Sequence, residues 1–430
     1  MERLLFLAHR IPFPPNKGDK IRAFNLLKQL SNVYSIWLGA FVDDPSDWRH
    51  ASELRKIVNS LYLIDIRPGW RKLGSLLGLL KGEALSLPYY RNRLMLRWVT
   101  ETIQKEKIER IIVYSSPMAQ YVLAPPFQGL HRVTDFVDVD SEKWRQYGQR
   151  RRWPLSWLYT REAVALLNFE RRVAAECDAS VFSTREEADL FRKLAPESAN
   201  RVVDIHNGVD TQYFSPELDL PNPYEGRERV LVFTGAMDYW ANVDAITWFA
   251  RAIFPQIRRR VPQASLYIVG AHPTAAVRRL HSEANGIKVT GAVKDIRPFL
   301  AHARAAVAPL RVARGVQNKV LEAMAMAKPV LATSDAMVGI QYDARFLPLV
   351  TDSPHSMIEQ AVALLNSCDS SKLGSLGREL VMQRYSWAKN LSYFEQLLRQ
   401  GLASTAITSG VRRRTDIRPT PNSIPRKEIS

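Results

Sequence analysis

The sequence predicts an α/β protein of two domains, each built around a mostly parallel sheet, and three observations support this. The chain of 430 residues is too long for one ordinary hydrophobic core and suits two domains of roughly 200 residues each. Short apolar runs alternate with longer helical segments, which is typical of parallel sheets covered by helices. The alternation stops at the turn-rich segment 220–226 and then starts again.

The first half of the chain predicts six buried strands and two clear helices. The strands are predicted at residues 4–9, 35–42, 61–66, 110–116, 132–138 and 179–184. A proline-rich loop follows the first strand, and apolar spacing predicts helices over residues 20–30 and 161–176.

The second half predicts a further sheet and ends in a polar tail. Its strands are predicted at residues 229–235, 265–270, 287–291, 305–310 and 328–333. A final helix is predicted over residues 385–398. Beyond about residue 403 the apolar periodicity stops and Ser, Thr, Pro and Arg dominate, so we expect a disordered tail.

The composition indicates a globular protein of a reducing compartment. Hydrophobic residues make up 46% of the chain and aromatic residues 10%, which is unlike a disordered protein. Cys177 and Cys368 are far apart and lack metal-ligand spacing, so we expect two reduced thiols in a cytoplasmic protein. The first apolar run lacks the cleavage site of a signal peptide, and no run reaches the roughly 18 residues of a membrane span.

The formal net charge of +17 leaves three classes of partner open: nucleic acid, an anionic membrane or phosphorylated substrates. Trp and Tyr are interleaved with Lys and Arg in two stretches, residues 67–98 and 150–161. This mixture suits the headgroup region of a bilayer, although a solvated basic face over an ordinary helix remains an alternative. We expect no nucleic-acid binding, because no zinc-finger spacing, RNA-binding aromatic motif or basic heptad occurs.

The segment 314–333, RGVQNKVLEAMAMAKPVLAT, predicts a loop, an apolar helix over residues 318–327 and a buried strand. Gly315 permits a close approach of the backbone to a ligand. Asn318 and Lys319 lie in the first helical turn, where unpaired N–H groups and the helix dipole favour a diphosphate. Glu322 follows one turn later, placed to accept hydrogen bonds from a sugar hydroxyl. The segment therefore predicts a nucleotide-sugar site.

Two motifs carry a resemblance to a known enzyme family. LEAMA followed by a basic residue and PV, together with HNGVD at residues 206–210 followed by Phe214 and Pro216, is similar to the signature of retaining glycosyltransferases of family 4. Residues 9–30 and 135–144 further resemble the exosortase-associated (PEP-CTERM) exopolysaccharide sugar transferases of bacteria. The likeness extends from about residue 4 to residue 398.

The resemblance implies the GT-B fold, in which two Rossmann-like domains face each other across a cleft. It places an acceptor-side domain at residues 1–215, a nucleotide-sugar domain at 216–384, a helix crossing back at 385–402 and the basic tail at 403–430. It implies a hexosyltransferase that moves a sugar, with retention, from a nucleoside-diphosphate sugar to a glycan acceptor, with polyprenyl as the expected carrier. We expect it at the inner face of the plasma membrane, as a peripheral protein of exopolysaccharide synthesis.

One position departs from the family pattern. The family usually has two glutamates eight positions apart, and the first falls at Arg314, whose guanidinium is a donor only. The resemblance therefore implies that Glu322 binds the ribose, but it does not imply that Arg314 recognises the donor sugar. We expect the backbone N–H groups of Val316 and Gln317 to take part of that role.

Three further loops complete the predicted donor site. Gly18 and Lys20 follow the first strand, where Gly18 permits close approach and Lys20 or Arg22 meets phosphate. A purely structural proline-rich connection is the alternative there. Gly235 and Asn242 follow the first strand of the second domain, with a simple helix cap as the alternative role of Asn242. Val293 and Lys294 match the loop that brackets the nucleobase in the family.

A carboxylate cluster marks the acceptor side. Asp138 and Asp140 follow a predicted strand and, with Asp135, are candidates to bind acceptor hydroxyls or to act as a base. Turn residues are the alternative interpretation. No group of residues has convincing metal-ligand spacing, so we expect a metal-independent enzyme with no cofactor.

The catalytic residues that we predict are Lys319, Glu322 and Asp138. Two other functions remain open. A sugar-nucleotide epimerase on the same fold would turn over without an acceptor. A catalytically inactive polysaccharide-assembly scaffold would not bind a nucleoside diphosphate, and Arg314 is the residue that keeps this alternative open.

Overall fold

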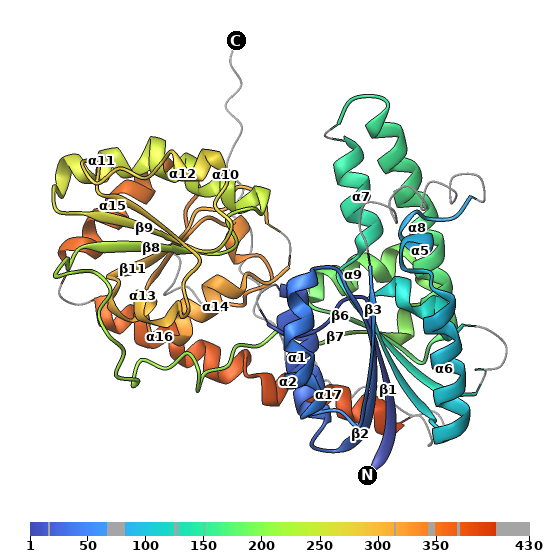
Figure 1. Cartoon of the computed structure of the whole chain (residues 1–430). Helices are drawn as coiled ribbons and strands as arrows, with labels where there is room; N and C mark the ends of the chain where they lie inside the picture. The colour runs from blue at the N-terminus through green and yellow to red at the C-terminus, as the bar shows by residue number, and fades with distance from the viewer. Residues whose placement is uncertain are drawn as a thin grey trace.

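The structure, a computed structural model, describes residues 1–15, 18–66, 82–123, 127, 129–149, 151–313, 315–342, 349–367 and 370–400. It shows two parallel-sheet domains side by side, the first in blue to green and the second in yellow to orange (Figure 1). The predicted tail and residues 67–81, Arg150, Arg314 and Cys368 lie outside the described residues.

The first domain contains a seven-stranded parallel sheet in the order β3-β2-β1-β4-β5-β6-β7. Its strands are β1 (Glu2–Ala8), β2 (Tyr34–Val42), β3 (Ser60–Asp65), β4 (Arg110–Tyr114), β5 (His131–Val137), β6 (Ala179–Phe182) and β7 (Val202–Asp204). Its α-helices are α1 (Gly18–Leu30), α2 (Ala51–Arg55), α5 (Ser86–Tyr90), α6 (Arg93–Glu106), α7 (Asp140–Gln149), α8 (Leu155–Glu176) and α9 (Arg185–Leu194). The strand order changes direction between β1 and β4, which is the switch point of a Rossmann-like sheet.

The second domain repeats this arrangement in a five-stranded parallel sheet ordered β10-β9-β8-β11-β12. Its strands are β8 (Val230–Thr234), β9 (Ser265–Val269), β10 (Ile287–Gly291), β11 (Ala305–Ala308) and β12 (Val330–Ala332). Its α-helices are α10 (Trp240–Trp248), α11 (Phe254–Arg260), α12 (Ala275–Arg278), α13 (Arg297–His302), α14 (Asn318–Ala325), α15 (Pro354–Asn366) and α16 (Ser370–Arg384). Here the switch point lies between β8 and β11.

The strands read as continuous apolar runs because helices cover both faces of each sheet. In β1, Leu5 and Leu7 pack in the same core as Met95 of α6, while Leu4 and Phe6 pack on the opposite face. The predicted strands all occur, with ends shifted by no more than about two residues. The short strand β7 was not predicted, and α8 begins at Leu155 rather than at residue 161.

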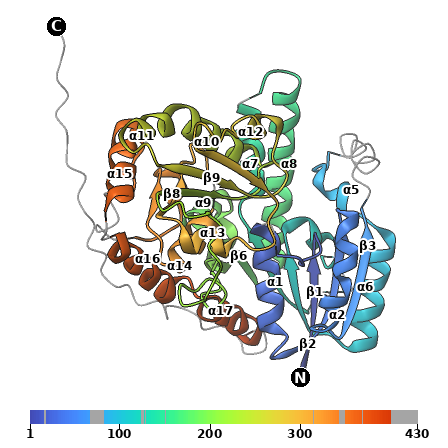
Figure 2. The same ribbon diagram turned by 60° about the vertical axis from the view of Figure 1, so that its left-hand side comes forward.

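The last described helix, α17 (Trp387–Gln400), returns from the second domain and packs on the first, beside α1 in Figures 1 and 2. Its buried side chains Leu391, Phe394 and Leu398 belong to the same core as β1. The carbonyl oxygen of Leu398 also accepts a hydrogen bond of 3.0 Å from Arg110 Nε. A segment from the end of the chain thus completes the core of the first domain.

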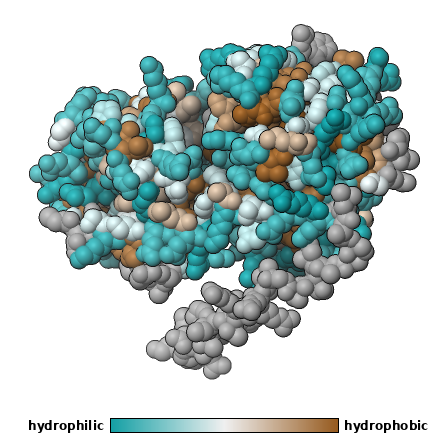
Figure 3. Space-filling view, turned by 90° about the horizontal axis from the view of Figure 1, so that it is seen from below, coloured by the Kyte–Doolittle hydropathy of each residue, from teal (hydrophilic) through white to brown (hydrophobic). Residues whose placement is uncertain are grey.

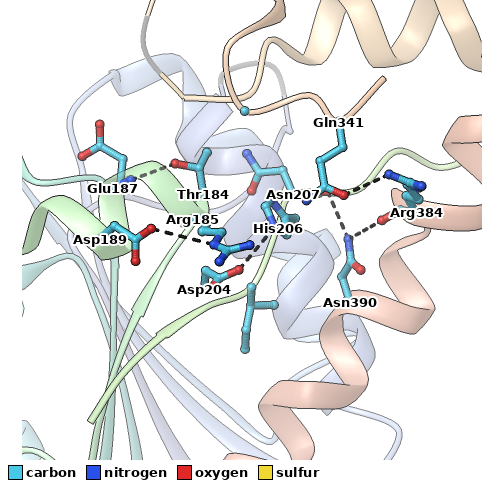
Figure 4. Close-up of polar contacts among 12 residues, drawn as sticks. Thr184, Arg185, Glu187, Asp189, Asp204, His206, Asn207, Gln341, Arg384 and Asn390 are labelled. Carbon is cyan, nitrogen blue, oxygen red and sulfur yellow. Dashed lines mark hydrogen bonds and ion pairs between the residues drawn. The ribbon is translucent and has the colours of Figure 1, made fainter. Parts of the chain in front are cut away.

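The chain passes between the two domains twice, near Val209 and near Ser386, and the two crossings lie side by side. Val209 in the first crossing pairs with Ser386 in the second, and its N–H donates to the carbonyl of Tyr385 at 2.8 Å. Asn390 Nδ2 donates to the carbonyl of Asn207 at 3.2 Å, close to the Arg384 and Gln341 pair shown in Figure 4. A Cβ on Gly208 would lie 2.7 Å from the backbone nitrogen of Trp387. The glycine therefore lets the two crossings lie in contact.

A hairpin formed by α7 and α8 projects from the first domain, at the top of Figure 1. The two helices pack closely, because a Cβ on Gly148 would lie 2.8 Å from Thr160 Oγ1. Elsewhere, the face seen from below is mostly hydrophilic, with hydrophobic residues in separate patches (Figure 3).

Candidate functional site

The carboxyl-terminal edges of the two sheets face each other, and the loops after their switch points meet there. A Cβ placed on Gly18, at the start of α1, would lie 3.9 Å from Nδ2 of Asn318, at the start of α14. A Cβ placed on Gly315 would lie 3.3 Å from Oδ1 of Asp138, which follows β5. Ligands of open α/β sheets bind at such edges. Both glycines therefore lie where the two domains are in contact.

Gly235, Asn242 and Lys319 come together at the switch point of the second domain. A Cβ on Gly235 would lie 2.8 Å from Asn242 Nδ2 and 3.4 Å from Lys319 Nζ. The φ of Gly235 is +150°, which also favours glycine. Lys319 Nζ donates a hydrogen bond to Asn242 Oδ1, and Asn242 Nδ2 donates to the carbonyl of Ala236 at 2.9 Å. The amide of Asn242 thereby fixes the lysine over the loop that follows β8.

Lys319 is held in a poorly hydrated position. Its ammonium lies 4.9 Å from the centre of the Phe233 ring. Burial lowers the pKa of Lys319 to about 8, and the nearby charge of Glu322 opposes that shift. Burial likewise raises the pKa of Glu322 to about 7, against the effect of Lys319. Each group thus lacks the solvation or the counter-charge that would restore its ordinary pKa.

The start of α14 is arranged to receive a polar ligand. Its N-cap residue, Gln317, makes no side-chain capping hydrogen bond, and its Nε2 instead donates to the carbonyl of Gly315 at 3.2 Å. Asn318 Oδ1 is buried without a hydrogen-bond partner among the described residues. Val316 is buried, and Gly315 has a φ of +63°. The positive end of the helix dipole and the unpartnered amide oxygen of Asn318 therefore lie together at the first turn of α14.

The carboxylate cluster predicted on the acceptor side contains two residues that the sequence did not indicate. Lys143 Nζ lies 2.9 Å from Asp138 Oδ2 and 2.9 Å from Asp140 Oδ1. Ser183 Oγ donates to Asp138 Oδ1 at 2.9 Å. Burial acts to raise the pKa of Asp138, but Lys143 and then Ser183 lower it below its ordinary value. Asp138 is therefore an ionised carboxylate in a half-buried position at neutral pH.

The backbone before Asp138 is strained. Val137 has a φ of +68°, which is rare for a β-branched residue. The N–H of Asp138 donates to the carbonyl of Phe136 at 2.9 Å, so Val137 is the centre of a three-residue turn. Ser115, at the end of the neighbouring strand β4, also has a positive φ of +74°. Such conformations cluster at functional sites, and this one directs the carboxylate of Asp138 toward Gly315.

The structure gives several other predicted residues different partners. The Lys20 ammonium is buried and lies 2.5 Å from Asp47 Oδ2, so in this structure it is paired within its own domain. Arg22 and Asp135 are both fully buried and pair at 2.7 Å, and Arg22 also donates to the carbonyl of Ile205. Neither residue is exposed to a ligand. The prediction that Arg22 meets phosphate, and the inclusion of Asp135 in the acceptor cluster, are therefore wrong.

Asn242 is not a helix cap, since the N-cap of α10 is Tyr239. Val293 and Lys294 lie after β10, where Val293 packs against a hydrophobic core and Lys294 is exposed. Near this loop the guanidinium of Arg297 lies 3.7 Å from the centre of the Tyr213 ring and binds Asp295. Sequence reasoning missed this pair, although Tyr213 is the third residue after the HNGVD motif.

The described residues contain no group of three or more His, Cys, Asp or Glu side chains placed to hold a metal ion. Across the same described ranges, no helix combines the length and the apolar character needed to cross a bilayer.

One family model matches part of the chain. Residues 228–367, within the second domain, match the model described as Glycosyl transferases group 1. No curated protein matches the chain.

Solved structures similar to the whole chain include several glycosyltransferases. Anabaena Alr3699/HepE, in complex with UDP and glucose, is 15% identical with a TM-score of 0.64, covering 93% of this chain and 100% of that one. WaaG, a glycosyltransferase involved in lipopolysaccharide biosynthesis, is 14% identical with a TM-score of 0.63, covering 92% and 99%. A putative UDP-N-acetylglucosamine 2-epimerase from Listeria monocytogenes is 13% identical with a TM-score of 0.54, covering 94% and 98%. These similarities confirm the predicted GT-B fold.

Proposed function

We propose that this protein is a retaining glycosyltransferase that moves a hexose from a nucleoside-diphosphate sugar to a lipid-linked glycan acceptor. The observation that carries the proposal is the position of Lys319, which Asn242 fixes at the switch point of the second domain, beside Gly235. A half-buried cation with a lowered pKa, next to a helix N-terminus and a backbone that a ligand can approach, is a site for a diphosphate.

In the proposed site the diphosphate lies between the start of α14 and Lys319. The N–H groups after Gly315 donate to its oxygens, and Asn318 Oδ1, which is without a partner among the described residues, accepts from a hydroxyl of the neighbouring sugar. Glu322, one turn later, accepts hydrogen bonds from the ribose hydroxyls. Binding of an anion beside Lys319 raises the pKa of the lysine toward its ordinary value, so the ligand stabilises the charged form.

The reaction that this arrangement supports is a substitution at the anomeric carbon with retention. The bond from that carbon to the diphosphate oxygen breaks, and Lys319 and the dipole of α14 stabilise the negative charge that develops. The acceptor oxygen then bonds to the carbon on the same face, and its proton passes to the departing phosphate oxygen. The positive charge comes from Lys319 and the helix, so we propose that no metal ion is required.

Asp138 serves the acceptor. It lies across from Gly315, on the opposite side of the meeting point of the two domains. Lys143 keeps it ionised, so it accepts a hydrogen bond from the attacking hydroxyl and orients that oxygen. This role requires an acceptor held by the first domain while the donor is held by the second.

We propose a lipid-linked acceptor and a role in exopolysaccharide synthesis at the inner face of the plasma membrane. The resemblance of residues 9–30 and 135–144 to exopolysaccharide sugar transferases supports this, as does the net charge of +17. HepE, which has the same fold, was solved with UDP and glucose, and UDP-glucose is therefore the first donor to test.

The first test is a thermal-shift titration with UDP, GDP, ADP and dTDP on the wild type, Glu322→Ala and Glu283→Ala. Glu283 is exposed on the same domain and serves as the matched control. We expect one nucleotide to raise the Tm of the wild type and of Glu283→Ala, and a much smaller rise in Glu322→Ala. No rise with any nucleotide in folded wild-type protein would refute the donor site and favour an inactive scaffold.

The second test separates transfer from epimerisation, since a putative epimerase also has this fold. Labelled nucleotide sugar is incubated with and without a bacterial membrane lipid extract. Label that enters the lipid fraction only when protein is present supports transfer. Conversion of the nucleotide sugar to its epimer without any acceptor would contradict the proposal.

A further inference from the structure

We propose that the tip of the α7–α8 hairpin docks on an anionic phospholipid bilayer and presents the acceptor-side cluster to membrane-bound acceptors. The tip consists of Arg151, Arg152, Trp153, Leu155 and Trp157. The proposal deepens the proposed function and rests on it only for the identity of the acceptor, because docking itself needs no nucleotide.

The tip exposes large hydrophobic side chains at the end of a projecting element. Trp153 is 81% exposed, Trp157 is 57% exposed and Leu155 is 44% exposed. Large apolar side chains are usually buried, and three of them within five residues form an exposed patch that calls for a partner. The hairpin extends beyond the body of the first domain (Figure 1), so the patch can reach a flat surface.

The charges at the tip identify the partner as an anionic bilayer. Arg151 and Arg152 are exposed directly beside Trp153. Tryptophan rings bind at the level of lipid headgroups, and arginines bind anionic lipid there. The net charge of +17 attracts the whole protein to the same surface. A second copy of the chain is disfavoured as the occupant, because it would bring two pairs of arginines together.

An aromatic cluster connects the tip to the acceptor side. In the middle of the hairpin the ring centre of Trp144 lies 5.3 Å from that of Tyr159, and Tyr147 lies 6.4 Å from Tyr159. α7 begins at Asp140, whose carboxylate shares Lys143 with Asp138. The ten residues of α7 span about 15 Å at 1.5 Å per residue. The length of the hairpin therefore determines the distance between Asp138 and the bilayer surface that the hairpin tip contacts.

The second domain meets α7 from the other side. Burial raises the pKa of Tyr239, and the side chains of Tyr147 and Lys143 are close enough to act on it as well. Tyr239 follows Gly235 in the loop after β8. A lipid-linked acceptor that rises along the aromatic cluster from the bilayer would thus arrive where the donor loop and Asp138 are both within reach.

Vesicle flotation tests the proposal with the full-length protein. The vesicles consist of phosphatidylcholine with or without phosphatidylglycerol, and the variants are Trp153→Ala/Trp157→Ala and Arg151→Gln/Arg152→Gln. The controls are Trp48→Ala, which removes an exposed tryptophan elsewhere in the first domain, and Arg251→Gln/Arg259→Gln, which removes two exposed arginines from the second.

We expect the wild type and both controls to float with the anionic vesicles and to stay unbound with phosphatidylcholine alone. Each tip variant should reduce the partition coefficient roughly tenfold or more. Quenching of tryptophan fluorescence by brominated lipids should decrease in Trp153→Ala/Trp157→Ala but not in Trp48→Ala.

Two results would overturn the proposal. One is equal flotation of the wild type and both tip variants. The other is a wild-type dimer in sedimentation that the tip variants convert to a monomer without any change in flotation, since the tip would then be an interface between copies. The Tm of each variant without nucleotide serves as the folding check. If the tryptophan variant unfolds, the arginine variant, which changes only exposed side chains, still tests the proposal. A wild type that floats but binds no nucleotide would refute the proposed function and leave the docking surface intact.

Discussion

The proposed donor side and the proposed acceptor side of this molecule contain the same kinds of groups in opposite electrostatic states. On the donor side, burial lowers the pKa of Lys319 to about 8 and raises that of Glu322 to about 7. On the acceptor side, Lys143 has two carboxylate partners and its pKa is well above the ordinary value, while that of Asp138 is lowered. The first pair is desolvated and incompletely compensated, whereas each charged group of the second cluster has an oppositely charged partner.

The difference shows where a charged ligand is needed. A site that binds a diphosphate keeps a cation with unsatisfied charge, because the ligand supplies the compensation. A site that binds a sugar hydroxyl meets a neutral ligand and must hold its own charges in place beforehand. The two sides therefore fit the two substrates of a transfer reaction, and the following predictions test that division.

The largest effect is expected from Lys319→Met. Loss of the cation that faces the leaving group should lower kcat/KM roughly 10²- to 10³-fold and weaken nucleotide binding. Titration calorimetry with the nucleotide and transfer kinetics measure both effects. Lys328→Met, which removes a half-buried lysine beyond the end of the same helix, is the control and should bind the nucleotide normally. Equal losses in the two variants would show that Lys319 has no specific role.

Asp138→Asn should separate the two sides. The amide keeps the size of the side chain but loses the negative charge that orients the attacking hydroxyl, so kcat should fall about 100-fold. The dissociation constant of the nucleotide should remain unchanged, since Asp138 belongs to the other domain. A parallel loss of nucleotide affinity would mean that the two sides form one site.

The affinity for the nucleoside diphosphate should fall about tenfold between pH 7 and pH 9. Lys319, whose pKa is about 8 in the free protein, must be protonated in the complex, so binding takes up a proton and weakens as the pH rises through that value. Glu322, with a pKa of about 7, titrates at the lower edge of this window and is almost fully ionised at pH 8.5. Calorimetry at pH 8.5 in two buffers of different ionisation enthalpy measures the proton uptake.

Lys319→Arg provides the control for this pH dependence. A guanidinium stays charged throughout the range, so its affinity should be flat between pH 7 and pH 9. A wild-type affinity that is equally flat would contradict the assignment of Lys319 as the diphosphate ligand.

The smallest effect is expected from Ser183→Ala. This variant removes one hydrogen bond of 2.9 Å to Asp138, so the acidic limb of the pH profile of kcat should move to higher pH. At neutral pH kcat should fall about two- to tenfold. Ser334→Ala, on the second domain, is a matched loss of a hydroxyl and should leave that limb in place.

The fold and the donor motif could be predicted because their signals are local. Apolar runs mark the strands, and Gly315, Lys319 and Glu322 lie within one short segment whose periodicity defines the helix. The partner of Lys319 could not be predicted, because Asn242 is 77 positions away and meets it only through the parallel order of β8 and β11. Ser183 likewise meets Asp138 through the pairing of β5 with β6.

The partners found for Lys20 and Arg22 have one physical cause. Lys20 and Arg22 follow a strand at the binding edge, yet α1 turns both side chains inward, to Asp47 and to Asp135. Spacing along the chain gives the position of a residue but not the face of the helix that becomes buried when a distant carboxylate packs there. The projection of the α7–α8 hairpin was also invisible in the sequence, since it depends on how α8 packs against the rest of the first domain.

The helix α17 has a consequence for the order in which this protein is made. Its residues Leu391, Phe394 and Leu398 complete a core that begins with Leu4 and Phe6. At about 5–20 residues per second, a ribosome needs on the order of ten to forty seconds to extend the chain from β7 to the end of α17. During that time the second domain can finish folding while the first still exposes the apolar groove that α17 will cover. The domain that is synthesised first is therefore the one completed last, and a nascent chain halted before residue 387 should be a better chaperone substrate than the released protein.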